Sequence, residues 1–185
     1  MKIIAISDTH NKLDEVFVPE GDLLIHAGDW SFRGQEWEVV QFNNELGKLK
    51  SRFTHGIITI PGNHDWLAAT DESKCRALIT NATVLIDEAI EIDGKKLYGS
   101  PYSPEFCNWA FGYDRADGNK KWESIPTGLD VLITHGPPIG ILDTVKPGCE
   151  HLGCEELLIA VNRAKPRVHC FGHIHGGYGT FEMDE

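Results

Sequence analysis

Short runs of apolar, mostly β-branched residues alternate with longer amphipathic stretches along this chain. Five of these runs are bounded by turn-forming residues and have the length of largely buried strands. The predicted strands lie at 2–7, 22–27, 56–60, 129–134 and 167–171. The alternation of such strands with amphipathic segments is typical of an α/β protein.

Three of the intervening stretches predict helices. Residues 35–49 and 154–164 repeat apolar side chains every three or four positions, the period of one helix face. A shorter helix is predicted at 71–80, where Asp71 is a suitable N-cap. We therefore expect helices to pack against the predicted strands.

The segment 89–99 has a different pattern. Asp93 and Gly94 separate two apolar pieces, which is a strong signal for a β-hairpin. An antiparallel pair beside the other strands predicts a mixed sheet or a second sheet. No repeat, low-complexity tract or change in composition marks a boundary, so we expect a single domain over residues 1–185.

The stretch 99–127 is the exception to this regularity, because it is rich in proline, glycine and aromatic side chains. A segment of this length is more often functional, or packed as an Ω-like loop, than a linker. Its aromatic residues are Tyr102, Phe106, Trp109, Phe111, Tyr113 and Trp122.

Composition narrows the class of protein. With 41% apolar residues the chain can bury a core without disulfides, and its five cysteines are expected to be reduced thiols. The apolar start is too short for a signal peptide and no run has transmembrane length, which predicts a cytoplasmic protein. The net charge of −11 argues against a broad nucleic-acid or anionic-membrane surface. The cysteines are Cys75, Cys107, Cys149, Cys154 and Cys170.

Residues able to bind metal ions follow each of the five predicted strands. In open α/β sheets the loops at the carboxyl ends of strands meet at one edge, so we expect these side chains to gather there. Imidazole nitrogens with carboxylate or amide oxygens suit divalent manganese, iron, zinc or nickel. Together the five segments predict a two-metal site. The candidate residues are Asp8 and His10, Asp29, Asn63 and His64, His135, and His173 and His175.

The order and spacing of these segments resemble the signature of the calcineurin-like metallophosphoesterases, which is D-x-H, GD-x-x, GNH-D/E, H-G and GH-x-H. Their surroundings are most similar to the class III phosphodiesterase-type branch that includes the metallophosphoesterase-domain-containing proteins. The resemblance implies two packed mixed β-sheets flanked by helices, an αββα sandwich. The matching segments are Asp8-Thr9-His10, Gly28-Asp29, Gly62-Asn63-His64-Asp65, Thr134-His135-Gly136 and Gly172-His173-Ile174-His175.

The resemblance also implies two divalent metal ions, with manganese favoured, and a role for each ligand. It places Asp8, His10 and His175 on one metal, Asn63, His135 and His173 on the other, and Asp29 between them. Some members of this branch lack the first histidine of GH-x-H. This chain has it as His173, which favours occupancy of both metal positions.

His64 is then left free for catalysis. A hydroxide that bridges two cations attacks phosphorus in line, and the leaving alkoxide needs a proton. His64 is the candidate general acid, and Asp65 is the nearest residue able to orient or charge it. Alternatively, His64 only hydrogen-bonds a phosphate oxygen.

Departures from a related signature narrow the reaction. Protein Ser/Thr phosphatases of this superfamily carry GD-x-V-D-R-G and GNHE, whereas here Phe32 replaces the acidic residue and Asp65 ends the later motif. The segment thus matches only part of the phosphatase signature that holds a phosphate group. This favours a phosphodiesterase for small or cyclic nucleotides. The alternatives are a phosphomonoesterase or Ser/Thr phosphoprotein phosphatase and, less favoured, a scaffold that binds metal without catalysis.

Substrate contacts are expected from Arg33 and from the aromatic stretch. Arg33 matches the phosphatase arginine by spacing, although a single loop arginine is more often solvated. Aromatic rings can stack on a nucleobase or can simply anchor the loop. The candidates for stacking are Tyr102, Phe106, Trp109 and Phe111, and Asn108 beside Trp109 is a candidate polar contact.

Overall fold

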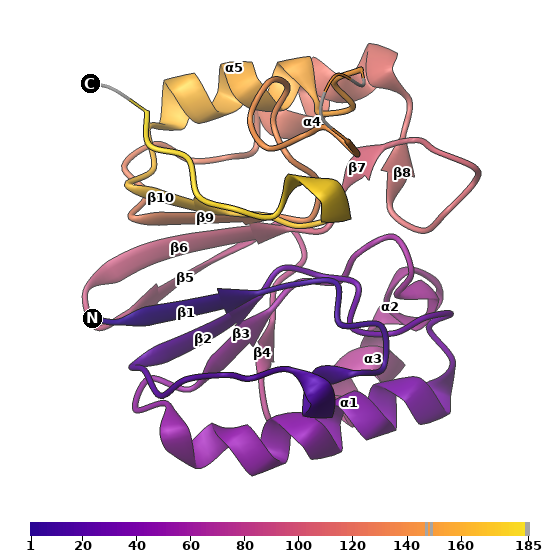
Figure 1. The fold of residues 1–185 in the computed structure, drawn as a ribbon, viewed down its shortest axis with the longest axis vertical. Helices are drawn as coiled ribbons and strands as arrows, with labels where there is room; N and C mark the ends of the chain where they lie inside the picture. The colour runs from indigo at the N-terminus through magenta and orange to yellow at the C-terminus, as the bar shows by residue number, and fades with distance from the viewer. Residues whose placement is uncertain (147, 149, 184–185) are drawn as a thin grey trace.

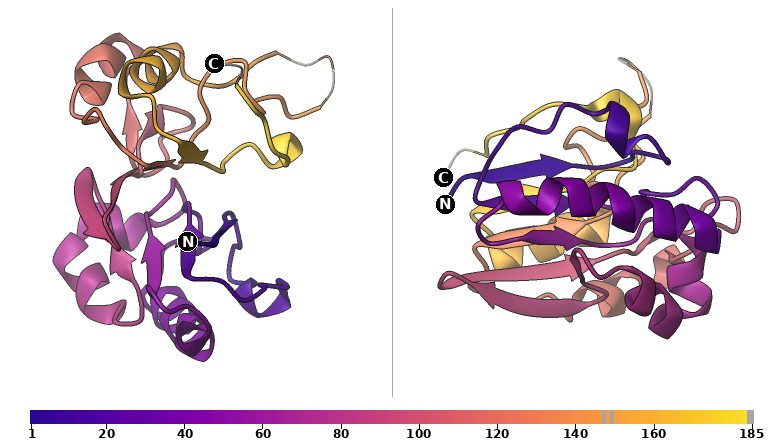
Figure 2. Two further views of the ribbon diagram at one scale, coloured as in Figure 1. Left: turned by 90° about the vertical axis from the view of Figure 1, so that its left-hand side faces the viewer. Right: turned by 90° about the horizontal axis from the view of Figure 1, so that it is seen from below.

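The computed structural model describes residues 1–146, 148 and 150–183, so that Cys149 lies outside the described residues. Two four-stranded sheets lie face to face, and each is covered on its outer face by helices (Figure 1). Figure 2 shows the same layers from two further directions, with α1 and α5 on opposite sides of the molecule. The αββα sandwich implied by the sequence is therefore confirmed.

The first sheet is parallel throughout. Its strand order is β1 (Ile3–Ile6), β2 (Leu23–His26), β3 (Ile57–Thr59) and β4 (Thr83–Val84). Its outer face is covered by α1 (Glu36–Leu49), α2 (Trp66–Thr70) and α3 (Glu72–Leu78) (Figure 1). The predicted cap of α3 is confirmed, because the Asp71 carboxylate accepts a hydrogen bond from the Lys74 amide at 3.0 Å.

The second sheet is mixed. Its order is β10 (Val168–Cys170), β9 (Val131–Thr134), β6 (Lys95–Ser100) and β5 (Glu88–Ile92). Only β5 and β6 are antiparallel, and they form the hairpin predicted from Asp93 and Gly94. Helices α4 (Gly118–Trp122) and α5 (Glu155–Ala164) cover its outer face (Figure 1).

Apolar side chains fill three layers, one between the sheets and one under each helical layer. Ile25 of β2 and Ile133 of β9 belong to the central layer, Phe42 to the layer under α1, and Leu157 to the layer under α5. Strands such as β2 and β9 are buried on both faces, which is why their sequences are continuous apolar runs.

The stretch 99–127 is more regular than expected. It contains the parallel pair β7 (Ser103–Pro104) and β8 (Gly112–Tyr113), followed by the 3₁₀ turn η3 (Arg115–Asp117) and by α4. The other 3₁₀ turns are η1 (Leu13–Glu15), η2 (Lys50–Arg52) and η4 (His175–Gly177). Within the described ranges, every helix is too short or too polar to cross a membrane.

Candidate metal centre

The loops that follow β1, β2, β3, β9 and β10 converge at one edge of the sandwich. Backbone hydrogen bonds join them directly, because the Asp8 amide donates to Gly28 O at 2.9 Å and the Gly172 amide donates to His135 O at 2.9 Å. The first bond joins two loops of the first sheet, and the second joins two loops of the second sheet. The two sheets are connected by hydrogen bonds from the His173 amide to the Asp8 carboxylate and from His135 Nδ1 to Ala27 O. The predicted convergence of the strand-end residues is therefore observed.

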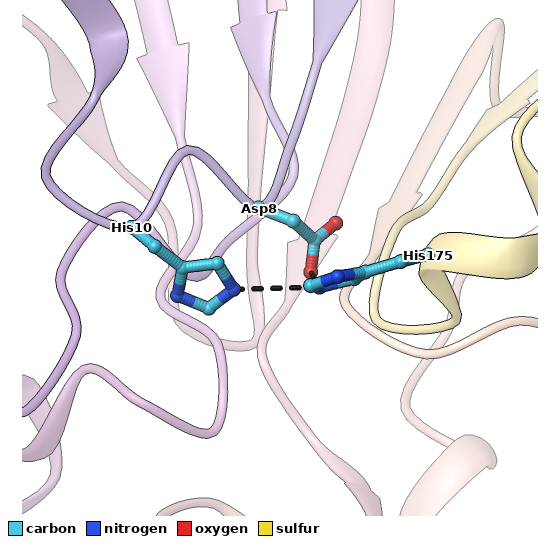
Figure 3. A group of neighbouring side chains, drawn as sticks. All are labelled: Asp8, His10 and His175. Carbon is cyan, nitrogen blue, oxygen red and sulfur yellow. Dashed lines mark hydrogen bonds and ion pairs between the residues drawn. The ribbon is translucent and has the colours of Figure 1, made fainter.

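Asp8, His10 and His175 form one group of potential ligands (Figure 3). The Nε2 atoms of His10 and His175 lie 3.3 Å apart, and His175 Nε2 lies 3.5 Å from Asp8 Oδ1. One donor atom from each residue lies within 4.8 Å of the others. The loop after β1 and the turn η4 thus meet at a position suited to one ion.

Asp29, His135 and His173 form a second group within the same 4.8 Å limit. Asn63 adjoins it, because Asn63 Oδ1 lies 2.9 Å from His135 Nε2. Asp29 Oδ2 lies 3.3 Å from His135 Nε2 and 4.0 Å from His10 Nε2. Asp29 therefore lies between the two groups, in the position that the family resemblance implies for a bridging ligand.

Three of the histidine rings are oriented by backbone carbonyl groups. In each ring Nδ1 is hydrogen-bonded to a carbonyl oxygen, so Nδ1 carries a proton and Nε2 points into the site. The pairs are His10 with Ser31 at 3.1 Å, His64 with Phe32 at 2.8 Å and His135 with Ala27 at 2.9 Å.

The donor atoms fit divalent cations. Imidazole nitrogens, carboxylate oxygens and one amide oxygen form the mixed set that manganese, iron, zinc and nickel accept. The ring of His10 donates through Nδ1, so its Nε2 lone pair faces the Nε2 atom of His175 at 3.3 Å. A cation shared by these nitrogens and by Asp8 would satisfy all three groups. Binding of metal by this set remains a prediction.

The ionisation of the carboxylates also suits cations. Burial raises the pKa of Asp8. Its hydrogen bond with His175 and the charge of His135 lower the pKa by more, so the net value lies well below the usual range. Burial likewise raises the pKa of Asp29, and the charge and hydrogen bond of His135 lower it overall. Both carboxylates are therefore ionised at neutral pH.

The histidines divide into two kinds. Burial, together with the charge of His135, lowers the pKa of His173 to about 4, and burial also lowers the pKa of His10. These rings are neutral at pH 7, as a metal ligand must be. Burial lowers the pKa of His135, but the charge of Asp29 and a hydrogen bond with it raise the pKa to about 9. A metal at this position would displace that proton.

The backbone is strained at several predicted ligands. Asp8, Asp29 and His173 have φ values of 54°, 55° and 70°, in the left-handed region that side chains rarely adopt. Each such residue costs on the order of 1–3 kcal/mol, and these conformations cluster at functional sites. Gly62 allows a close approach of the loops, because a Cβ atom there would collide with Asp29 Oδ1 and would lie 2.6 Å from Cε1 of His135.

Asp65 has a different role from the one expected. Its side chain is fully buried, and its carboxylate accepts hydrogen bonds from the amides of Asp29 at 2.9 Å, Gly62 at 2.7 Å and Ser31 at 3.0 Å. The Ser31 hydroxyl donates a further bond at 2.6 Å. Among the described residues, no hydrogen bond joins Asp65 to the His64 side chain. The expectation that Asp65 orients His64 is corrected: it holds two ligand-bearing loops together.

His64 lies beside the two groups. Its Nε2 atom is 3.9 Å from Asp29 Oδ2, and its side chain is 20% exposed. Its ring centre lies 4.2 Å from that of Trp109 and 5.7 Å from that of Phe32. His64 also forms a close group with His10 and Asp29, so distance alone fits a ligand as well as a proton donor.

Glu38 on α1 supports the site and was not predicted from the sequence. Its carboxylate accepts hydrogen bonds from the amides of Phe32 at 3.2 Å, Arg33 at 3.1 Å and Gln35 at 2.6 Å. It thus fixes the loop whose Phe32 carbonyl orients His64. The spacing of Gln35 and Glu38 as a capping box is the signal that would have pointed to it.

The predicted substrate contacts lie at different distances from the centre. Trp109 packs against His64, whereas Asn108 is exposed at the tip of its loop. Arg33 is exposed, and its guanidinium carbon lies 5.9 Å from the Phe32 ring centre. Their roles remain predictions. Two further aromatic residues of the stretch, Tyr102 and Phe111, pack edge to face at 5.5 Å, which fits the anchoring alternative.

Two sheets between helical layers, with loops rich in aspartate and histidine gathered at one edge, are typical of metal-dependent phosphoesterases. A family model described as calcineurin-like phosphoesterase matches residues 1–177, and the chain belongs to that family.

Relatives of this chain occur in animals and bacteria. It is similar to human metallophosphoesterase domain-containing protein 1, with 38% identity over 97% of this chain and 62% of the relative. A UPF0046 protein of Caenorhabditis elegans is 37% identical over 97% of this chain and 65% of its own length. An uncharacterized metallophosphoesterase of Helicobacter pylori is 29% identical over 74% of this chain and 39% of its own. The chain thus spans less than two thirds of the length of these relatives.

Proposed function

We propose that this protein is a phosphoesterase that requires two divalent metal ions and hydrolyses small phosphodiesters, in particular those of small or cyclic nucleotides. The observation that carries the proposal is the meeting of two ligand groups at Asp29, with His64 beside them. Membership of the calcineurin-like phosphoesterase family supports the reaction class.

Each metal would be held by residues from both sheets. Asp8 and His10 from the first sheet meet His175 from the second, and Asn63 meets His135 and His173, with Asp29 shared. Manganese is the cation that we favour. When bound, the two ions would supply a water molecule activated as the nucleophile and positive charge that neutralises the phosphate oxygens.

The proton for the leaving group is assigned to His64. Phe32 O accepts from Nδ1, so Nε2 is the atom that gives a proton to the departing oxygen. The Asp29 carboxylate, 3.9 Å from Nε2, attracts the positive charge of the ring while it holds that proton. Trp109 against the ring limits its rotation and shields it from water on that side.

A diester fits this edge better than a monoester does. A monoester dianion carries one more negative charge than a diester and gains more from cationic side chains near phosphorus. The Arg33 guanidinium lies over the ring of Phe32, so it adds little to a clamp on phosphate. The balance of charge therefore favours the less charged substrate.

The test compares bis(4-nitrophenyl) phosphate with 4-nitrophenyl phosphate, before and after chelation and with Mn²⁺, Fe²⁺, Zn²⁺ or Ni²⁺ restored. We expect turnover only with metal, and a higher kcat/KM for the diester. A panel of 2′,3′- and 3′,5′-cyclic nucleotides then narrows the substrate. A large preference for the monoester would favour a phosphomonoesterase or protein phosphatase, and metal binding without turnover would favour a scaffold.

A further inference from the structure

His64 has a different aromatic neighbour on the side of each ligand group. Phe32 lies 5.7 Å from the His64 ring centre and 6.0 Å from that of His10, which belongs to the first group. Trp109 lies 4.2 Å from the His64 ring centre, with an angle of 33° between the ring planes. The two aromatic rings therefore mark two different directions away from the centre.

A crevice of about the size of one water molecule lies on the side of the second ligand group. Asn63 and His173 form part of its lining, and Ser103, Phe106 and Trp109 from the stretch 99–127 form much of the remainder. Neither His64 nor Phe32 lines it. Trp109 both lines the crevice and stacks on His64, so it forms the wall between them.

We propose that the site has two aromatic subsites: Phe32 binds the ring of the leaving alcohol, and the exposed ring of Phe106, which forms part of the crevice wall, binds the ring of the alcohol that stays on phosphorus. The proposal rests on the proposed phosphodiesterase function, and it specifies the substrate as a diester with an aromatic group on each side.

The direction follows from the position of the proton donor. The departing oxygen must come within hydrogen-bond distance of His64 Nε2, so the leaving group extends past His64 and its neighbour Phe32. The other ester group points to the opposite side, where Asn63 and His173 form part of the crevice wall. Trp109 separates that group from His64, which keeps the proton from the wrong oxygen.

Both rings are available to a ligand. Phe32 is 50% exposed and Phe106 is 66% exposed. Single exposed apolar side chains are common on protein surfaces, and these two differ from the exposed Phe17 in lying beside the ligand groups. Stacking of an aromatic group on such a ring is worth about fivefold or more in affinity. The exposure also means that truncation of either ring leaves the core intact.

The experiment measures kcat/KM for methyl 4-nitrophenyl phosphate and phenyl 4-nitrophenyl phosphate, which share a leaving group and differ in the retained group. We expect Phe32→Ala to lower both values about fivefold or more without changing their ratio. Phe106→Ala is expected to lower the ratio of the phenyl to the methyl ester by a similar factor. Phe17→Ala, which removes an 88% exposed phenylalanine outside the site, is the matched control.

A third substrate separates ring binding from general damage. Methyl hexafluoroisopropyl phosphate has an acidic leaving group without a ring, so Phe32→Ala is expected to affect it much less than the 4-nitrophenyl ester. An equal loss on both esters would contradict the assignment of Phe32. Metal content and melting temperature, measured for each variant, should match those of the unmodified protein.

The remaining outcomes are also decisive. An unchanged ratio in Phe106→Ala, or a changed ratio in Phe32→Ala, would overturn the two-subsite arrangement while the unmodified protein still hydrolyses the diesters. If the unmodified protein with two metals bound hydrolyses none of these diesters, the proposed function itself fails. The two failures are therefore distinguishable.

Discussion

The carboxylate of Asp65 accepts a hydrogen bond from the backbone amide of Asp29 at 2.9 Å, in a position where Asp65 has no exposed surface. Asp65 belongs to the loop after β3, which carries Asn63, and Asp29 belongs to the loop after β2. The bond thus fixes the spacing of two predicted metal-binding loops. Burial and the charge of Asp29 raise the pKa of Asp65 to about 8, although the hydrogen bonds from Ser31 and Gly62 oppose that rise.

Asp65→Asn should weaken both folding and metal binding. The NH₂ group of asparagine would face backbone N–H groups that now donate hydrogen bonds to the Asp65 carboxylate. At least one buried N–H group would then lack an acceptor. We expect the free energy of unfolding to fall by about 1–3 kcal/mol and the affinity for Mn²⁺ to fall about 10–100-fold. Urea unfolding and metal titration measure the two effects, with the exposed Asp14→Asn as control. Unchanged metal affinity would show that the bond does not position the ligands.

His64→Ala should separate catalysis from metal binding. If His64 gives a proton to the leaving oxygen, its loss lowers kcat for a diester by about 10²–10⁴-fold and leaves the metal content unchanged. The effect should be smaller for 4-nitrophenyl esters, whose leaving group needs little protonation, than for phenyl esters. Loss of one metal from this variant would instead identify His64 as a ligand.

Glu38→Gln should act on His64 from a distance. The carboxylate holds the amides of Phe32, Arg33 and Gln35, so an amide in its place releases part of this loop. We expect the free energy of unfolding to fall by about 1–3 kcal/mol. We also expect kcat to fall, because the Phe32 carbonyl in this loop orients His64. The control is Glu36→Gln on the same helix, which removes only an exposed ion pair with Lys74 and should change little. Equal effects of the two substitutions would refute the positioning role.

Two histidines outside the site, His26 and His169, make the stability of the metal-free protein sensitive to acid. His26 in β2 and His169 in β10 are hydrogen-bonded to the hydroxyl groups of Thr9 and Thr134, at 2.9 Å and 2.8 Å. Burial lowers the pKa of His26 to about 4 and of His169 to about 3.

An unfolded chain protonates these rings near their ordinary pKa of 6.5, whereas the folded chain keeps them neutral. The unfolded state therefore binds more protons below that pH, and the free energy of unfolding decreases as pH falls from about 6.5 toward 4. Urea unfolding at a series of pH values measures this slope. This slope is proportional to the number of protons taken up on unfolding, and His169→Gln should lower that number by up to one. An unchanged slope would contradict the lowered pKa of His169.

The fold was largely predictable because its signals are local. The strand β2 is buried on both faces and reads as a continuous apolar run, and α1 repeats apolar residues with the helical period. The structure places both within two residues of the predicted bounds. The pair β7 and β8 was not predicted, because each strand is two residues long and exists only through its pairing with the other.

The site was predictable in composition but not in its supporting contacts. The candidate metal-binding residues could be found because each follows a strand and carries a recognisable side chain. The interaction of Asp65 with Asp29 and Ser31 spans more than 30 positions in sequence, and no spacing rule connects them. The position of Phe32 beside His64 depends on the path of a loop. Contacts of this kind are set by tertiary packing and are visible only in the structure.

The metal content of the purified protein, measured by plasma mass spectrometry beside its rate with bis(4-nitrophenyl) phosphate, tests the central claim most directly. We expect two divalent ions per chain and metal-dependent turnover, with one ion retained and turnover lost in His175→Ala and in His173→Ala. These two residues belong to different ligand groups, so each variant should empty one position. A single ion in the unmodified protein, or full turnover after chelation, would contradict the account.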